Sequence, residues 1–219
     1  MKIGINFSGA IADINALKSK YAKVLFDIDL PIEETEPYIG KKQKLDSEQY
    51  HLIQKLVYND KVVLNSTQEI PDSFNSMRKL REDNHDLTII VSKFSLEESE
   101  EYVRDWLMQK SNGYFGDLDI IHIKNEYNDI YALNEKNIKV LIDDNFRRLE
   151  LISGNEKSNI DYLFFFRKPY NAMYHVPEDW NRLLVHYWNE IYQKICELNK
   201  FNPKNSKQSS VFSQRDHQQ

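Results

Sequence analysis

Five short apolar runs are spread along the chain and are separated by more polar segments. They are rich in Ile, Val, Leu and Phe and show no regular alternation with polar residues, which is typical of strands covered on both faces. We therefore expect five buried strands. The runs are 2–7, 87–91, 118–123, 138–142 and 161–166.

Helical patterns lie between most of these runs. In the segment 95–107, Ser95 and Glu98 have the spacing of a capping box and precede an apolar face. The segments 72–80 and 179–198 also place apolar residues at helical spacing, so each is predicted to be one helix. Strands that alternate with helices predict βαβ units and a mostly parallel sheet.

The stretch between the first two runs is too long for a single crossover helix. It contains helical patterns over 14–21 and after Asp46, so we expect a small helical cap over residues 13–71. The core domain would then comprise 1–12 and 72–201. The last residues, 202–219, hold too little apolar surface to order themselves and are expected to form a disordered tail.

Composition limits the class of protein. The 219 residues are 41% hydrophobic and 29% charged, which favours a soluble globular chain with one main core. A net charge of −5 gives no basic footprint for a nucleic-acid polymer. The one cysteine excludes an intrachain disulfide, and no signal peptide or membrane-spanning run is found. We expect a cytoplasmic protein with no membrane partner.

Polar side chains follow three of the predicted strands. Ligands of an open parallel sheet bind at the carboxyl ends of its strands, so these residues are the candidate site. Two adjacent carboxylates at a strand end repel each other unless water, a cation or a helix N-terminus offsets their charge. The residues are Asn6, Ser8 and Gly9 after the first run, Ser92 and Lys93 after the second, and Asp143 and Asp144 after the fourth.

At these residues the chain resembles the haloacid dehalogenase (HAD) superfamily of phosphohydrolases, and most closely its 5′(3′)-deoxyribonucleotidase-like branch. The resemblance runs from Met1 to about Ile195. It rests on "LTIIVSKFSLEESEEYVRDWL", on "IKVLIDDN" and on "FFFRKPYN" followed by a Trp-bearing terminal segment. It implies an α/β, Rossmann-like fold, a parallel sheet flanked by helices, and a small helical cap inserted after the first strand. The first, second and fourth strands would lie side by side.

The resemblance also implies a chemistry. In the family, an Asp at the end of the first strand attacks phosphorus and helps to hold Mg²⁺, and a second Asp two positions later acts as acid and base. A hydroxyl after the second strand binds the phosphoryl oxygens, and a lysine screens charge. By this resemblance Ser92 is the phosphate-binding hydroxyl, and Asp143 and Asp144 are the metal-binding pair.

This sequence departs from the family pattern where the reaction takes place. Asn6 occupies the nucleophile position, and a carboxamide has neither the charge nor the basicity to form an aspartyl-phosphate. Ser8 occupies the acid and base position. The position of the family lysine falls near Asp129, with Lys124 and Lys136 on either side. We therefore expect very low or absent phosphatase activity.

Loss of the carboxylate at Asn6 also removes one anionic ligand for Mg²⁺. The amide oxygen of Asn6, the main-chain carbonyl of Ser8 and the Asp143–Asp144 pair would hold the ion only weakly. No other metal or cofactor is expected, since the histidines are isolated in the sequence.

Two classes of function stay open. The first is a catalytically degenerate phosphatase homologue that binds a phosphorylated or anionic small molecule, or a partner protein. The second is an enzyme, either a weak Mg²⁺-dependent phosphohydrolase acting on nucleotides or small phosphomonoesters, or one repurposed for another reaction in the same pocket.

Plainer interpretations exist for single residues. Asp143 and Asp144 could simply begin a loop and cap a helix that starts near Phe146. Ser92 could serve a turn. Asp27 and Asp29 in "FDIDLP" form a second acidic pair, which we interpret as cap surface, and Arg167 and Lys168 could meet an anionic ligand or be solvated.

Overall fold

The computed structural model describes residues 1–36, 44–91, 99–123, 126–176 and 182–200. Its centre is a six-stranded parallel sheet in the order β3-β2-β1-β4-β5-β6. The five predicted strands are confirmed, and β1 lies between β2 and β4 as the resemblance implied. The strands are β1 (Lys2–Asn6), β2 (Asp86–Val91), β3 (Asp119–His122), β4 (Val140–Asp143), β5 (Tyr162–Phe166) and β6 (Arg182–Val185).

The prediction of one helix over 179–198 is wrong. Strand β6 pairs in parallel with β5, and helix α8 begins only at Trp188. The apolar run at 183–185 suits a strand that covers the open edge of β5. Tyr187, an aromatic residue within the segment predicted as a helix, is 74% exposed.

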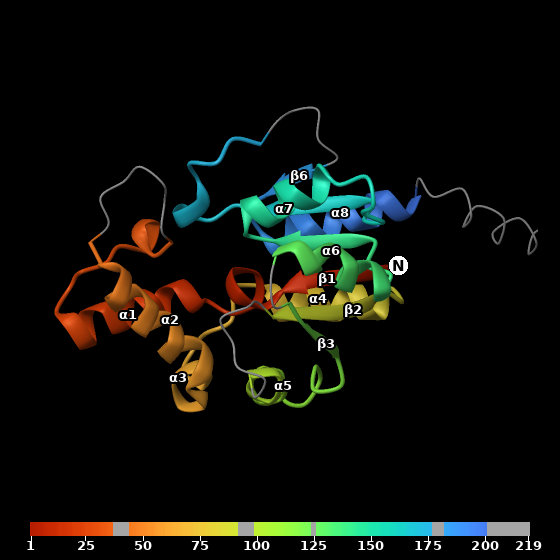
Figure 1. Cartoon of the computed structure of the whole chain (residues 1–219). Coiled ribbons are helices and arrows are strands. Elements are labelled where there is room, and N and C mark those ends of the chain that lie inside the picture. Colours follow the sequence, from red (N-terminus) through yellow and green to blue (C-terminus); the bar gives the residue numbers. More distant parts are fainter. Residues whose placement is uncertain (37–43, 92–98, 124–125, 177–181, 201–219) are drawn as a thin grey trace, which may run out of the picture.

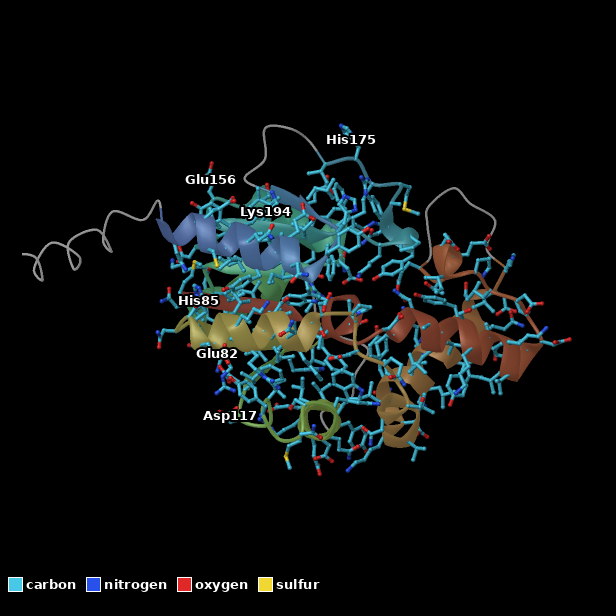
Figure 2. The ribbon with its side chains drawn as sticks, turned by 180° about the vertical axis from the view of Figure 1, so that it is seen from behind. Glu82, His85, Asp117, Glu156, His175 and Lys194 are labelled. Carbon is cyan, nitrogen blue, oxygen red and sulfur yellow. The ribbon has the colours of Figure 1, made fainter. Side chains whose placement is uncertain are left out.

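Helices cover both faces of the sheet (Figure 1). Consecutive strand residues face opposite layers, so Ile89 and Phe164 pack in one core cluster, whereas Ile90 and Phe165 pack in the other. The first cluster includes residues of α4 (Ser73–Glu82), α5 (Ser99–Lys110) and α8 (Trp188–Lys200), and the second includes residues of α6 (Glu126–Glu135) and α7 (Phe146–Ser153). Figure 2 shows the first layer from behind, with α4 and α8 packed side by side.

Three further helices lie beyond the carboxyl ends of the strands (Figure 1) and are called the cap below: α1 (Ile14–Phe26), α2 (Ser47–Asn59) and α3 (Lys61–Asn65). The helix predicted after Asp46 is confirmed as α2, and it begins with a capping box in which Asp46 and Gln49 bond each other's main chain. The segment that enters the cap and the segment that leaves it are joined by a main-chain hydrogen bond, in which Ile70 N donates to Ile11 O at 2.7 Å. The domain boundaries at 12/13 and 71/72 stay a prediction, and the tail lies outside the described residues.

A tight turn over Phe7–Ile11 carries the chain from β1 to the cap. Gly9 has a φ of 81°, a conformation that favours glycine. The ring of Phe7 meets Trp106 edge to face at 5.2 Å, and Trp188 Nε1 donates to Ala10 O at 2.7 Å. These contacts fix the turn, and with it the side chains of Asn6 and Ser8.

None of the helices in the described ranges combines the length and apolar character that crossing a bilayer requires.

Candidate functional site

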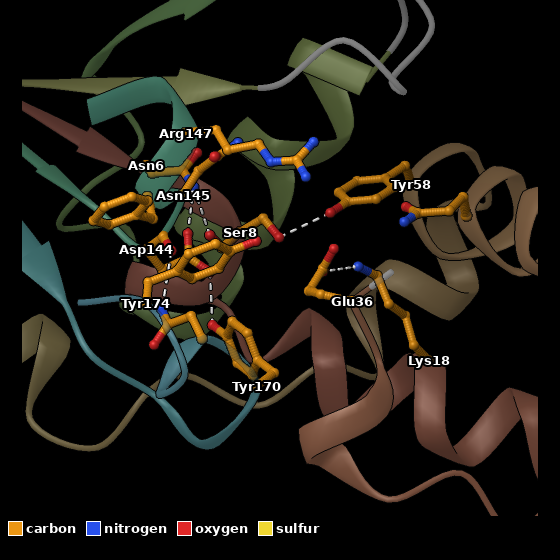
Figure 3. Close-up of a pocket in the computed structure, with 13 residues that line it drawn as sticks. Asn6, Ser8, Lys18, Glu36, Tyr58, Asp144, Asn145, Arg147, Tyr170 and Tyr174 are labelled. Carbon is orange, nitrogen blue, oxygen red and sulfur yellow. Dashed lines mark hydrogen bonds and ion pairs between the residues drawn. The ribbon is translucent and has the colours of Figure 1, made fainter. Parts of the chain in front are cut away.

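A cavity of about 290 Å³ lies between the strand ends and the cap (Figure 3). The sheet side contributes Asn6, Ser8 and Asp144, and the cap side contributes Lys18, Glu36 and Tyr58. The structure therefore brings together polar residues from β1, from the loop after β4 and from the insertion. Its size is at the small end of ligand cavities in proteins.

The side-chain amide of Asn6 joins two oxygens at the floor of this cavity. Nδ2 donates to the main-chain oxygen of Ser8 at 2.7 Å and to Oδ1 of Asp144 at 2.8 Å. Asn6 is 3% exposed, and its Oδ1 finds no partner among the described residues. An aspartate at this position could not make either bond when ionised, because it has no hydrogen to donate.

Asp144 is the centre of the hydrogen-bond network. Its Oδ2 accepts from Tyr170 Oη at 2.6 Å, and its main-chain oxygen accepts from Asn171 Nδ2 at 2.9 Å. Burial of the carboxylate raises the pKa of Asp144 to about 7, and the neighbouring charge of Asp143 acts in the same direction. The hydrogen bonds from Tyr170 and Asn6 oppose this shift.

Asp143 is fully buried and turns toward α7 instead. Its Oδ2 accepts from Arg148 Nη1 at 2.7 Å, and its Oδ1 accepts from Asn145 N at 2.9 Å. Helix α7 begins at Phe146 as expected, but its N-cap is Asn145 rather than either aspartate. The two adjacent carboxylates therefore have different surroundings, and only Asp144 lines the cavity.

Three of the four groups that would hold Mg²⁺ are already engaged by protein donors, and the fourth, the neutral amide oxygen of Asn6, has no partner among the described residues. The Asn6 amide donates to Ser8 O and Asp144, and Arg148 donates to Asp143. Hard dications need several free, anionic oxygen ligands, and no cluster of three metal-ligating side chains occurs in the described ranges. The arrangement does not fit a resident Mg²⁺ ion. Figure 2 shows His85 and His175 in separate parts of the molecule.

Other residues singled out in the sequence lie elsewhere. Ser92, Lys93 and Lys124 are outside the described residues. Lys136 pairs with Asp119 at 2.9 Å, at the start of β3 and thus at the opposite end of the sheet.

Two more pairs of charged residues lie outside the cavity lining. They are Arg167 and Lys168 after β5, and Asp27 and Asp29 at the end of α1. Arg167 Nη2 donates to the main-chain oxygens of Ala172 and Tyr174, so it holds the loop after β5. Asp27 and Asp29 are exposed and pair with Lys23, which agrees with their interpretation as cap surface.

Sequence reasoning missed the cap side of the cavity and Tyr170. Lys18 is 1% exposed and pairs with Glu36, and Tyr58 Oη lies 2.8 Å from Ser8 Oγ. One signal was present: Lys18 shares a face of α1 with Ile14 and Leu17, and a lysine on an apolar helix face is unusual unless it is paired.

Gly9→Ala tests the turn that positions Asn6. A Cβ at Gly9 would overlap Asp144 Oδ2 and lie 2.6 Å from Tyr170 Oη, and the φ of 81° disfavours any L side chain. We expect a loss of about 2 kcal/mol or more in the free energy of unfolding, measured by urea denaturation. Gly113→Ala is the matched control, because Gly113 has a φ of 86° and open space around it, so it should lose only about 1 kcal/mol. Equal losses in the two variants would contradict the close packing at Gly9.

Asp144→Asn tests the raised pKa. Because the folded pKa of Asp144 is about 7 and its ordinary value is 3.8, the folded state binds the extra proton between these values. The contribution of Asp144 to stability therefore falls as pH rises from about 4 to about 7. Relative to wild type, Asp144→Asn should gain about 2 kcal/mol between pH 5 and pH 7 in urea unfolding. A difference that is flat with pH, or that changes in the other direction, would show that the carboxyl is not perturbed in this way.

No family model and no curated protein sequence matches the chain. Solved structures do match. A HAD family hydrolase from Deinococcus radiodurans R1, determined with bound phosphate and sodium, superposes with a TM-score of 0.56 at 11% identity, covering 90% of this chain and 96% of that one.

Two more HAD hydrolases match over similar lengths. The family IA, variant 3 hydrolase from Entamoeba histolytica HM-1:IMSS has a TM-score of 0.51 at 14% identity, covering 91% of this chain and 99% of that chain. The HAD-superfamily hydrolase from Ehrlichia chaffeensis has a TM-score of 0.51 at 12% identity, with 90% and 97% covered. The chain therefore has the α/β, Rossmann-like fold of HAD-superfamily hydrolases.

Proposed function

We propose that this protein is a catalytically degenerate member of the HAD-type hydrolases that binds an anionic small molecule in the cavity between sheet and cap. One observation carries the proposal. The residue at the nucleophile position, Asn6, is an amide whose nitrogen is committed to Ser8 O and Asp144. Fold alone does not settle function, so the argument rests on this site.

The chemistry of the floor supports binding rather than phosphoryl transfer. An amide is not a nucleophile toward phosphorus under ordinary conditions, because its nitrogen lone pair is delocalised and its oxygen carries no full charge. The hydroxyl of Ser8 shares a hydrogen bond with Tyr58 and is no substitute for a carboxylate as acid or base. The hydrogen bonds from the Asn6 amide to Ser8 O and Asp144 support the same proposal, because they occupy oxygens that a phosphate-activating cation would need.

Phosphate release tests the proposal. Purified protein is incubated with an aryl phosphate and with nucleoside monophosphates, with Mg²⁺ and with a chelator, and Asn6→Ala is measured in parallel. We expect the wild type and Asn6→Ala to release phosphate equally slowly, at the background rate. Turnover of about 1 per second or faster that is lost in Asn6→Ala would overturn the proposal.

The second candidate is a weak phosphohydrolase. The HAD family hydrolase from Deinococcus radiodurans, which has the same fold, was determined with bound phosphate, which favours a phosphorylated ligand here. Under this alternative the same assay gives slow, Mg²⁺-dependent turnover in wild type. The carboxylate of Asp144 would then be required, and Asp144→Asn would abolish the turnover.

A further inference from the structure

The cap side of the cavity contains a buried cation that the proposed function has not used. Lys18, on α1, has a side chain that is 2% exposed, and its ammonium pairs with the carboxylate of Glu36. The same carboxylate accepts from Tyr50 Oη at 3.2 Å. Figure 3 shows this ion pair facing Ser8 and Asp144 across the cavity.

The two partners of this ion pair are held very differently. Lys18 lies within α1, and Tyr50 lies within α2, so both donors are fixed by helices. Glu36 follows a single turn of 3-10 helix, Ile32–Glu34, and its side chain is 40% exposed. The cation therefore lies on a helix that lines the cavity, whereas the anion lies outside the helices, between α1 and α2.

A buried lysine needs a negative partner. Burial acts to lower the pKa of Lys18, but the charge and hydrogen bond of Glu36, together with Tyr58 and Tyr50, outweigh it, and the pKa is raised. Removing an ammonium group from water without a partner is very unfavourable, so some anion must stay beside Lys18. A ligand that brings its own anion satisfies this condition and can take the place of Glu36.

We propose that Lys18 and Tyr50 form a subsite for the carboxylate of a small ligand, and that Glu36 occupies this subsite when the ligand is absent. The inference rests on the proposed function, since it names the anionic group that the cavity binds. One ammonium and one phenol match a single negative charge with two oxygens. The geometry seen with Glu36 is itself that of a bound carboxylate.

Two buried oxygens without a hydrogen-bond donor, called the orphan acceptors below, indicate which other groups the ligand carries. Gln54 Oε1, on the cap side, and Asn6 Oδ1, on the sheet side, are buried and find no partner in the described part of the chain. The orientation of Gln54 is set because its Nε2 donates to Tyr50 Oη. Buried acceptors of this kind are unfavourable unless a donor reaches them. The ligand is therefore a small carboxylic acid that also carries hydroxyl or amino donors.

Chemical rescue tests the subsite. Glu36→Ala leaves Lys18 without its partner, and its melting temperature is measured in sodium propionate and in sodium chloride at equal ionic strength. We expect propionate to raise the melting temperature of Glu36→Ala by about 3 °C or more over chloride, and to have little effect on wild type. The double variant Lys18→Met/Glu36→Ala should not respond. If Glu36→Ala does not fold, Glu36→Gln, which keeps the shape and removes the charge, is titrated in the same way.

Two further arms separate the explanations. Phosphate at the same ionic strength should stabilise Glu36→Ala less than propionate, and an equal response would overturn the preference for a carboxylate. Lactate, which differs from propionate by one hydroxyl, should bind Glu36→Ala more tightly than propionate in calorimetry, and equal affinities would overturn the role of the orphan acceptors. No propionate response in any Glu36 variant would overturn the subsite itself. None of these results depends on phosphate release, so failure of the subsite and failure of the proposed function are distinguishable.

Discussion

Asn6→Asp lowers the free energy of unfolding by about 3 kcal/mol or more when divalent cations are removed. Well above pH 7, where Asp144 is ionised, the substitution places a second carboxylate against Oδ1 of Asp144, where Asn6 Nδ2 now donates at 2.8 Å, and it leaves both groups without that hydrogen bond. Urea unfolding in the presence of a chelator measures the loss. Adding Mg²⁺ should restore a large part of it, because the new carboxylate supplies the anionic ligand that the wild-type site lacks.

Asn6→Ala is the matched control for this prediction. It removes the same hydrogen bonds but adds no charge, so it should lose less stability than Asn6→Asp and should not respond to Mg²⁺. If Asn6→Asp is as stable as wild type without a cation, the amide is not what holds Asp144 in place.

Arg148→Met is expected to lower the free energy of unfolding by about 3–5 kcal/mol. The substitution leaves the fully buried carboxylate of Asp143 without the guanidinium that donates to it at 2.7 Å. Breaking a buried ion pair from one side leaves an uncompensated charge, which is much less favourable than removing both charges. Urea unfolding measures the loss, and Arg148→Met/Asp143→Asn should recover part of it.

The neighbouring arginine is a control for this second prediction. Arg147 is exposed at the cavity, so Arg147→Met should change stability by no more than about 0.5 kcal/mol. Equal losses for the two arginines would show that the Asp143–Arg148 pair has no special role in the loop after β4.

Much of the fold could be predicted from the sequence, because buried parallel strands are short uninterrupted apolar runs. The exception, β6, lies in a segment whose apolar residues also fit a helical spacing. Nothing local shows that the edge of β5 needs a partner, so the pattern alone could not separate the strand at Arg182–Val185 from the helix after it.

The candidate site was predictable only in part. Because ligands bind at strand ends, the sequence predicts that Asn6, Ser8 and Asp144 belong to one site. In the structure the side-chain amide of Asn6 donates to both of the other residues. Adjacent residues of an extended chain point to opposite sides, but the sequence does not say which of Asp143 and Asp144 faces the cavity. The cap residues depend on how the insertion packs over the sheet, and that packing has no local signature.

The structure has the fold that the resemblance implies, but the residue at the nucleophile position differs from the family pattern. HAD hydrolases of 11–14% identity share the fold over about nine-tenths of the chain. At the end of β1, however, an amide stands where the resemblance expects a nucleophilic carboxylate. Its nitrogen donates to oxygens that would otherwise be available to a cation, so under the proposed function the absence of phosphoryl transfer and weak cation binding would both follow from a single residue.

Calorimetric titration of the wild-type protein with MgCl₂ tests whether the Asn6 amide takes the place of a cation. With Asn6 Nδ2 donating to Ser8 O and Asp144, we expect no saturable binding up to about 10 mM Mg²⁺, whereas Asn6→Asp gives a saturable isotherm. Saturable Mg²⁺ binding by the wild type that Asp144→Asn abolishes would contradict this expectation.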